Sequence, residues 1–192
     1  MKNKNLKLSI VIPCYNESDN LAILIRNLSK IDTNIFEIIL VNNGSTDNTK
    51  LVLMSLINIK SKYKLVNLKN NIGYGHGIMS GVKEAAGDII AWTHADLQTN
   101  PKDIINAFDT YINIPDYENS VIKGKRIKRN FFDFFFTYCM GQISSLILKV
   151  KVSDVNAQPK MFHRTFLNEI KTHPNDFSLD LYFLYMAKIK GY

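Results

Sequence analysis

Short, nearly continuous runs of valine, isoleucine and leucine recur along the chain, and helix-length stretches separate them. Runs of strand length cover residues 8–14, 36–41, 64–68, 88–93 and, more weakly, 120–123. Strands that are apolar on both faces are typical of a parallel sheet with helices packed on each side. The alternation therefore predicts an α/β fold with a doubly wound, mostly parallel sheet and helices on both faces.

The stretches between the runs carry the spacing of amphipathic helices. Residues 18–30 are the clearest case, because Ser18 suits an N-cap and one face carries Leu21, Leu24, Ile25 and Leu28. Residues 46–59 and 76–86 repeat the pattern. Ligands of such sheets bind beyond the carboxyl ends of the strands, so we expect the site among the polar residues after each run.

The composition fits one globular domain of 192 residues, with 46% hydrophobic and 21% charged residues. Cys14 and Cys139 lack the spacing of a disulfide framework or a zinc site, which favours packing roles in a reducing compartment. The first residues lack the apolar core and cleavage site of a signal peptide. We therefore expect a cytoplasmic protein.

Positive charge gathers in one segment, and its sign alone does not choose among nucleic acid, anionic lipid and phosphorylated ligands. The net charge is +7, and a basic cluster stands directly before the phenylalanine-rich residues 131–136; it comprises Lys123, Lys125, Arg126, Lys128 and Arg129. Because charges and aromatics do not alternate, we expect no nucleic-acid partner. Two interpretations remain: a membrane-surface site for a lipid phosphate, or a solvated face beside core or dimer-forming phenylalanines.

The uncharged residues 134–148 are too short and too polar for a membrane span, since they include Gly141, Gln142, Ser144 and Ser145.

Two polar segments at strand-to-helix turns suit a nucleotide. Residues 42–47 read Asn-Asn-Gly-Ser-Thr-Asp, in which Asn, Ser and Asp side chains can hydrogen-bond a base or ribose; the alternative is a plain turn with a helix cap. Residues 71–77 place three glycines before a helix, where backbone N–H groups can meet phosphate. Their spacing is not the dinucleotide fingerprint, so tight helix packing is the alternative there.

His94, Asp96 and Gln98 follow the fourth run, and alternation with period two would project them to one side. Carboxylate and amide oxygens suit Mg²⁺ or Mn²⁺, and an imidazole is tolerated better by Mn²⁺. A divalent ion there would bridge a diphosphate and stabilise the charge that develops as a sugar bond breaks. The alternative is a solvated turn leading to a helix that starts at Pro101.

Taken in order, these segments resemble the glycosyltransferase family 2 proteins with a GT-A fold, particularly the polyprenyl-phosphate (dolichyl-phosphate) sugar transferases. The matching pieces are residues 10–17, 37–49, 71–75, Gly81 with 86–88, and 95–98 with Pro101. The resemblance implies one glycosyltransferase domain over residues 1–192. Its nucleotide-sugar-binding half would be residues 1–100, and its acceptor-side half residues 101–192.

The resemblance also implies roles for single residues. The donor would contact Pro13, Tyr15, Glu17, Asn43, Ser45, Gly73 and Gly75. Asp96 and Gln98 match metal and diphosphate ligands, with His94 as a further candidate. Asp154 matches an aspartate near acceptor and donor, and Asp180 matches a carboxylate position before the last helix; with Asp96 these are the predicted catalytic residues.

The chain departs from the family pattern in three places. Asn42 and Asn43 replace two acidic residues, which leaves the base preference open, and His94 replaces the first acid of an Asp-x-Asp motif. Relatives usually continue beyond the position of Tyr192 with another strand and an Arg-containing segment. We therefore expect a chain truncated at its C-terminus or a fragment.

The expected reaction is inverting transfer from a nucleotide-diphosphate sugar, and the acceptor decides which residues it needs. A polyprenyl phosphate at the inner face of the membrane is already anionic and calls for cations, for which Arg126 and Arg129 are the candidates. A glycan hydroxyl must lose a proton, so Asp154 or Asp180 would be its base. The third alternative is a non-catalytic module that binds nucleotide sugars.

Overall fold

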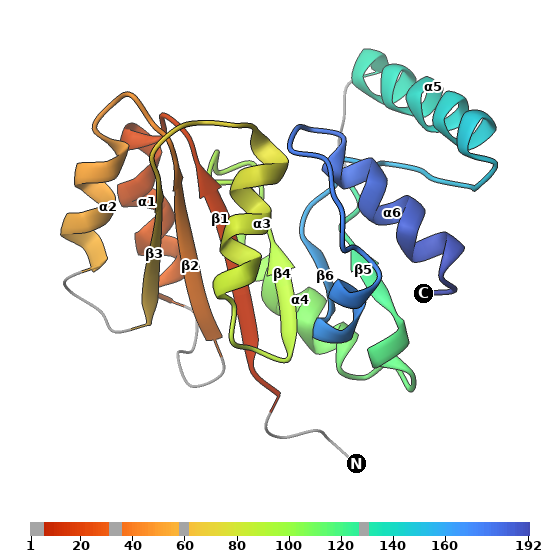
Figure 1. Cartoon of the computed structure of the whole chain (residues 1–192), viewed down its shortest axis with the longest axis horizontal. Helices are drawn as coiled ribbons and strands as arrows, with labels where there is room; N and C mark the ends of the chain where they lie inside the picture. Colours follow the sequence, from red (N-terminus) through yellow and green to blue (C-terminus); the bar gives the residue numbers. More distant parts are fainter. Residues whose placement is uncertain (1–5, 31–35, 58–61, 127–130) are drawn as a thin grey trace.

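The computed structural model describes residues 6–30, 36–57, 62–126 and 131–192, and these ranges contain one six-stranded sheet (Figure 1). Its strand order is β3-β2-β1-β4-β6-β5. The strands are β1 (Leu8–Cys14), β2 (Phe36–Asn43), β3 (Tyr63–Leu68), β4 (Ile89–Trp92), β5 (Val121–Lys123) and β6 (Lys160–His163). Strands β1 to β4 are parallel, and β6 is antiparallel to both of its neighbours. The predicted mostly parallel sheet is therefore confirmed.

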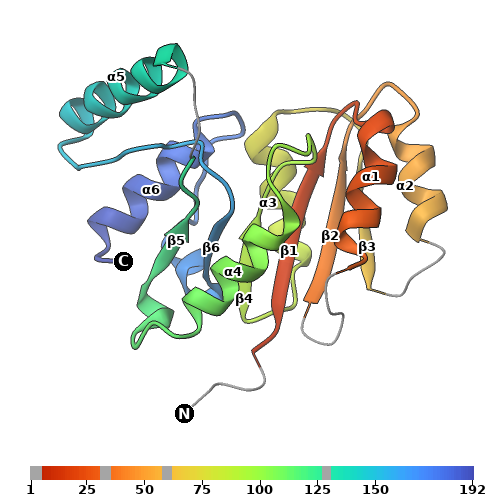
Figure 2. The ribbon, with the colours of Figure 1, turned by 180° about the vertical axis from the view of Figure 1, so that it is seen from behind.

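Helices cover both faces of this sheet, as predicted. Their bounds are α1 (Ser18–Leu28), α2 (Thr49–Ile57), α3 (Tyr74–Glu84), α4 (Pro101–Tyr111), α5 (Phe131–Leu148) and α6 (Leu179–Ile189), with the short 3₁₀ helices η1 (Tyr117–Asn119) and η2 (Arg164–Asn168). One buried cluster joins the sheet to α1, α2 and α4, and a second joins it to α3 and α6. Figure 1 shows α3 in front of the sheet, and Figure 2 shows α1 and α4 in front from the opposite side.

The apolar runs are continuous because successive residues of one strand enter different clusters. In β1, Ile10 and Ile12 pack on the α1 side, whereas Val11 packs on the α3 side. In β2, Ile38 and Ile39 divide in the same way. This is the pattern that two covered faces require of a parallel strand.

Helix starts follow the local capping chemistry. Asn100 caps α4, since its side chain accepts a hydrogen bond from the Lys102 N–H at 3.0 Å, and Pro101 takes the first helical position. Helix α2 begins at Thr49 and not at residue 46, because the Asp47 carboxylate accepts from the Thr49 N–H at 2.9 Å and holds the preceding residues in a turn.

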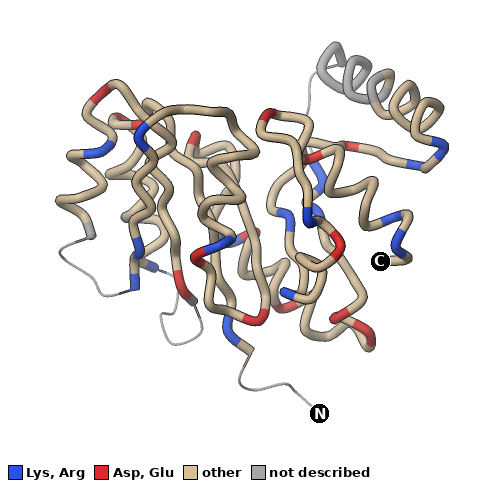
Figure 3. Tube along the Cα trace, viewed as in Figure 1, with Lys and Arg blue, Asp and Glu red and all other residues tan. Residues whose placement is uncertain are grey.

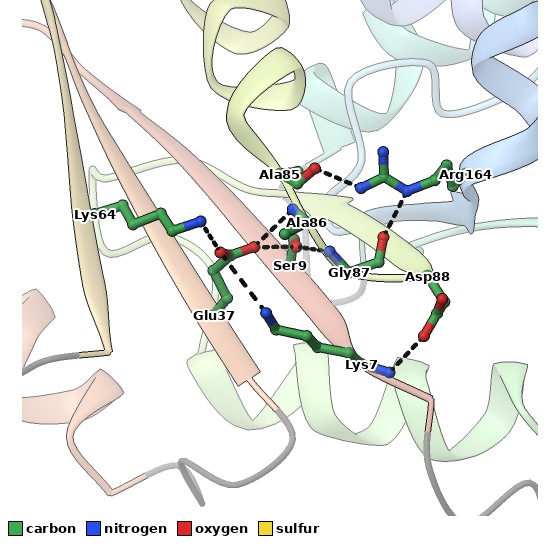
Figure 4. A network of polar contacts seen from close by, with 9 residues as sticks. All are labelled: Lys7, Ser9, Glu37, Lys64, Ala85, Ala86, Gly87, Asp88 and Arg164. Atoms are coloured by element: carbon green, nitrogen blue, oxygen red, sulfur yellow. Dashed lines mark hydrogen bonds and ion pairs between the residues drawn. The ribbon is translucent and has the colours of Figure 1, made fainter.

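A polar network ties the sheet together near the starts of β1 and β4 (Figure 4). Glu37, which is 5% exposed, accepts hydrogen bonds from the Ser9 hydroxyl at 2.6 Å and the Ala86 N–H at 2.9 Å. It also pairs with Lys64 of β3. Arg164 of η2 donates to the backbone carbonyls of Ala85 and Gly87. The network links three strands, β1, β2 and β3, with the turn before β4 at this end of the sheet.

Candidate functional site

Three loops meet at the carboxyl edge of the parallel strands, namely residues 15–17, 44–47 and 93–98. The first two are joined directly. The Asn16 N–H donates to the Ser45 hydroxyl at 3.1 Å, and the Thr46 N–H donates to the Asn16 side-chain oxygen at 2.9 Å. The Glu17 N–H donates to the Thr49 hydroxyl at 2.7 Å. The structure thus brings the two predicted donor loops together as one surface.

The predicted donor residues of the first loop differ in what they offer a ligand. The Tyr15 side chain is 46% exposed, so its ring is open to solvent at this edge. Pro13 is partly buried within β1, opposite Val41. Glu17 is partly buried, and its carboxylate accepts from the Asn20 side chain at 2.7 Å.

Asn42 and Asn43 are buried and tied into the protein. The Asn42 side chain accepts from the Ser45 N–H at 3.2 Å and donates to the Asn67 side chain at 2.6 Å. Asn43 donates to the Gly73 carbonyl at 3.1 Å. An aspartate at position 43 would face this carbonyl with a second acceptor, so the amide is the group that fits here.

The glycines before α3 serve close packing. A Cβ on Gly73 would lie 2.3 Å from the Asn175 carbonyl oxygen, and one on Gly75 would lie 2.4 Å from the Pro174 oxygen. The His76 N–H donates to the Asn175 carbonyl at 3.0 Å. The backbone of residues 174–176 therefore packs against the start of α3, as the packing alternative predicts. Contact of Gly73 and Gly75 with the donor stays a prediction.

The segment after β4 turns instead of continuing as a strand. Strand β4 ends at Trp92, Leu97 has a φ of 63°, and the Gln98 N–H donates to Asp96 Oδ1 at 3.0 Å. The predicted alternation of side chains through Gln98 is therefore wrong. A tight turn replaces it because the Asp96 carboxylate binds the backbone two residues on. Asp96 is partly buried and Gln98 is exposed.

His94 lies beside Asp96 and against Tyr74. The two rings are stacked, with centroids 5.5 Å apart and an interplanar angle of 16°. Burial lowers the pKa of His94, although the charges of Asp96 and Asp180 act in the opposite direction. A neutral imidazole is the form that binds a metal ion. Within the described residues, no group of three or more His, Cys, Asp or Glu side chains is placed to hold a metal ion.

Asp180, the second residue of α6, is 2% exposed and fully engaged. Its Oδ1 lies 2.8 Å from Lys160 Nζ and accepts from the Trp92 indole at 3.2 Å. Its Oδ2 accepts from Gln158 at 3.2 Å and from the Tyr74 hydroxyl at 3.5 Å. This arrangement places the predicted base in the interior, bonded to four side chains.

Sequence reasoning missed the four partners of Asp180, namely Tyr74, Trp92, Gln158 and Lys160. Lys160 is 0% exposed, and burial lowers its pKa to about 8, although Asp180 acts to raise it. The available signal was a lysine directly before Met161 and Phe162, which are also fully buried. Such a lysine needs a buried partner once its strand is buried, but the sequence alone does not show that burial.

Asp154 and Arg126, both predicted to act on the acceptor, lie together. The Arg126 N–H donates to Asp154 Oδ2 at 2.8 Å, and its guanidinium donates to the Asn156 carbonyl at 2.8 Å. The Arg126 residue is exposed and its charge contributes to the lowered pKa of His94, so it belongs to the same region. Lys128 and Arg129 lie outside the described residues.

Helix α5 lies at one end of the molecule, away from the sheet, in both Figures 1 and 2. Its last two turns expose apolar side chains: Ile143 is 58% exposed, Leu146 81% and Ile147 72%. The exposed Lys149 and Lys151 follow, and Figure 3 shows basic residues in blue where the chain leaves this helix. Among the described residues, no helix has the length and apolar character to cross a bilayer.

Solved structures share this architecture. A mannosyltransferase from Pyrobaculum calidifontis, in complex with GDP-Man and Mn²⁺, matches with a TM-score of 0.68 and 18% identity, over 93% of this chain and 50% of that one. Glucosyl-3-phosphoglycerate synthase from Mycobacterium tuberculosis, in complex with Mn²⁺, UDP and glucosyl-3-phosphoglycerate, matches with a TM-score of 0.72 and 14% identity, over 93% and 64%. These likenesses confirm the predicted GT-A fold.

Sequence relatives match a part of the chain. An undecaprenyl-phosphate 4-deoxy-4-formamido-L-arabinose transferase of Yersinia enterocolitica is 42% identical over 102 residues, which is 51% of this chain and 31% of the relative. An uncharacterized glycosyltransferase of Synechocystis is 38% identical over 109 residues, or 55% and 34%. The aligned part thus spans about a third of each relative. The profile of glycosyl transferase family 2 matches residues 9–173. The chain therefore belongs to glycosyl transferase family 2.

Proposed function

We propose that this chain carries the catalytic site of a glycosyltransferase that moves a sugar from a nucleotide-diphosphate sugar to a polyprenyl phosphate. Membership of the family supports sugar transfer, and the name of the Yersinia relative supports the class of acceptor. The observation that carries the choice of acceptor is the state of Asp180. It is buried, and both of its oxygens are hydrogen-bonded.

A hydroxyl acceptor needs a base that can take its proton in the transition state. Asp180 is a poor base because it is enclosed and shares a pair with Lys160. Asp154 already accepts a hydrogen bond from the backbone of Arg126, which makes its carboxylate a weaker base. A phosphate acceptor needs no base, and the exposed Arg126 offers it a cation. The site therefore favours an acceptor that arrives already ionised.

The donor would lie across the loops after β1, β2 and β4. The exposed ring of Tyr15 suits stacking on a base, and Ser45 and Asn16 line the same surface. Asn43 is buried, with its Oδ1 unpaired within the described residues, so it shapes the floor of this site.

Asp96, Gln98 and His94 would hold a divalent ion. The residues fit such an ion, because within the described residues only Oδ1 of Asp96 accepts a hydrogen bond, which leaves Oδ2 available, and the His94 imidazole lies in the same turn. The mixture of carboxylate, amide and imidazole favours Mn²⁺ over Mg²⁺. When bound, the ion would neutralise charge on the diphosphate leaving group. The donor diphosphate would have to complete the ligand shell of the ion, since the described residues offer no group of three His, Cys, Asp or Glu side chains for it.

In the proposed transfer, an oxygen of the acceptor phosphate attacks the anomeric carbon of the sugar. The new carbon–oxygen bond forms as the bond to the diphosphate breaks, and the electron pair leaves with the nucleoside diphosphate. Attack from the side opposite the leaving group inverts the configuration. Arg126 would hold the acceptor phosphate, and Arg129 keeps the same predicted role.

The membrane would deliver such an acceptor. The exposed apolar residues of α5, followed by Lys149 and Lys151, suit a surface that rests among lipid headgroups. We therefore propose peripheral contact of this end of the molecule with the inner face of the membrane.

A transfer assay tests the proposal. The chain is incubated with Mn²⁺, labelled UDP- or GDP-sugars, and either undecaprenyl phosphate in detergent or an oligosaccharide. We expect product on the lipid phosphate alone, no product with EDTA, and a large loss in Arg126→Gln but not in the exposed neighbour Lys125→Gln. Product on the oligosaccharide would favour the glycan alternative. Calorimetric binding of UDP or GDP without transfer to either acceptor would favour the non-catalytic module.

A further inference from the structure

A buried ion pair connects the helical side of the fold to the residues proposed to bind the metal. Lys160 opens β6 directly opposite Trp92 of β4, and Asp180 belongs to the first turn of α6. Both side chains are buried, at 0% and 2% exposure, and their charged atoms lie 2.8 Å apart. A buried charge is kept in a protein only where such a partner compensates it. The pair therefore joins β6 to α6 and holds the Asp180 carboxylate in place.

Tyr74 connects this ion pair to His94, because it contacts both Asp180 and His94. Its hydroxyl donates to Asp180 Oδ2 at 3.5 Å and receives a hydrogen bond from Gln158 at 3.3 Å. A tyrosine hydroxyl is protonated at neutral pH, so it can donate to this carboxylate. The polar end of this ring is thus held by the interior.

The faces of the same ring hold two other aromatic side chains. His94 stacks on Tyr74 with centroids 5.5 Å apart, and Phe177 stacks on it at 4.9 Å. His94 is two residues from Asp96, in the turn that follows β4. A ring fixed at both its hydroxyl and its faces restricts the orientation of the imidazole packed on it.

We infer that Lys160, Asp180 and Tyr74 are positioning residues that orient His94 and so set the affinity of the site for a divalent ion. This inference rests on the proposed function, because it assigns a use to His94 and Asp96. None of the three residues is a catalytic residue in it. Asp180 acts on the site through Tyr74 and does not take a proton from the acceptor.

The chain contains a reporter of this network. Trp92 is the only tryptophan, it is fully buried, and its indole donates to Asp180 Oδ1 at 3.2 Å. We expect its fluorescence to respond to the environment of the Asp180 carboxylate and to fall when paramagnetic Mn²⁺ binds at the proposed site. Metal binding is therefore measurable without any transfer reaction.

The test is a titration of the chain with Mn²⁺, in the presence of UDP and separately of GDP, followed by Trp92 fluorescence and by calorimetry. Tyr74→Phe keeps the stack on His94 and removes the hydroxyl bonds. We expect it to weaken Mn²⁺ affinity by about tenfold, the lower end of the effect of removing a residue that orients a metal ligand. Tyr74→Leu removes the stack as well and should weaken affinity further.

Tyr111→Phe is the matched control. Tyr111 is fully buried, and its hydroxyl donates to the carbonyls of Tyr117 and Ser120. Loss of this hydroxyl should lower stability without changing Mn²⁺ affinity. Equal Mn²⁺ affinity in Tyr74→Phe and the wild type, with the wild type binding, would overturn the positioning role alone. Failure of the wild type to bind Mn²⁺ with either nucleotide would overturn the proposed function and the inference together.

Discussion

The ammonium of Lys160 lies 2.8 Å from the carboxylate of Asp180, and both side chains are shielded from solvent. The pair joins β6, which carries Lys160, to α6, which carries Asp180. The pair explains how Asp180, predicted from the sequence to be a catalytic carboxylate, can lie in the interior.

Removal of one partner should expose how much the pair matters for stability. Lys160→Met leaves Asp180 charged and buried, so we expect a loss of about 3–5 kcal/mol in the free energy of unfolding. Urea denaturation followed by Trp92 fluorescence measures it, and Lys83→Met on the exposed side of α3 is the control. The double variant with Asp180→Asn should be less destabilised than the sum of the single variants. Additive losses would contradict a direct interaction.

Asp96→Asn should remove most of the transfer activity and the dependence on Mn²⁺. The change keeps the shape of the side chain but removes the only carboxylate in the turn after β4, so we expect a loss on the order of 100-fold in kcat/KM. Asp103→Asn, on the exposed first turn of α4, is the control. Retention of Mn²⁺-dependent activity in Asp96→Asn would exclude Asp96 as the metal ligand.

Glu37 should make stability depend on pH in the acid range. Burial acts to raise its pKa, but hydrogen bonds from Lys64, Ser9 and Ala86 outweigh this and hold the pKa below its usual value. The stabilisation is therefore present above the unfolded pKa of Glu37 and lost as the pH falls through the lower, folded pKa. Urea denaturation between pH 7 and pH 3 measures the slope.

Glu37→Gln should flatten this acid-range slope, whereas Glu84→Gln, exposed at the end of α3, should leave it unchanged. An unchanged slope in Glu37→Gln would show that other carboxylates cause the acid sensitivity.

Gly77→Ala should destabilise the protein through Asn43. A Cβ at Gly77 would lie 2.7 Å from the Asn43 side chain, which would have to leave its bond to the Gly73 carbonyl. We expect a loss of about 1–3 kcal/mol, as for other overpacked positions. In Gly141→Ala the new Cβ would meet nothing closer than 3.4 Å, so thermal denaturation should show no loss. Equal stability of both variants would contradict the tight contact.

Leu146→Glu should weaken binding to vesicles that contain anionic lipid. Leu146 is 81% exposed on α5, and a carboxylate there would oppose both burial and the lipid charge. Leu51→Glu, on a residue of α2 that is 65% exposed, is the matched control. Co-sedimentation with vesicles compares the two. If both variants bind as the wild type does, α5 is not the membrane surface.

The sequence alone determined the class of fold and the family. Continuous apolar runs predict a sheet covered on both faces, because each strand must supply side chains to two cores, and β1 and β2 do so. The order of short polar segments after the runs was specific enough to identify glycosyl transferase family 2. Pro101 also indicated the start of α4 correctly.

Only the tertiary structure decided where the predicted site residues lie and what they contact. Strand β6 has four residues and no distinct pattern, so its pairing with β4, and with it the burial of Lys160, could not be predicted. Asp180 is 88 residues away from Trp92, its partner through the indole, and 106 from Tyr74. A carboxylate has the same sequence signature whether it faces solvent or a buried amine. Its environment comes from packing between distant elements, and this placed a predicted base in the interior, bonded to four side chains.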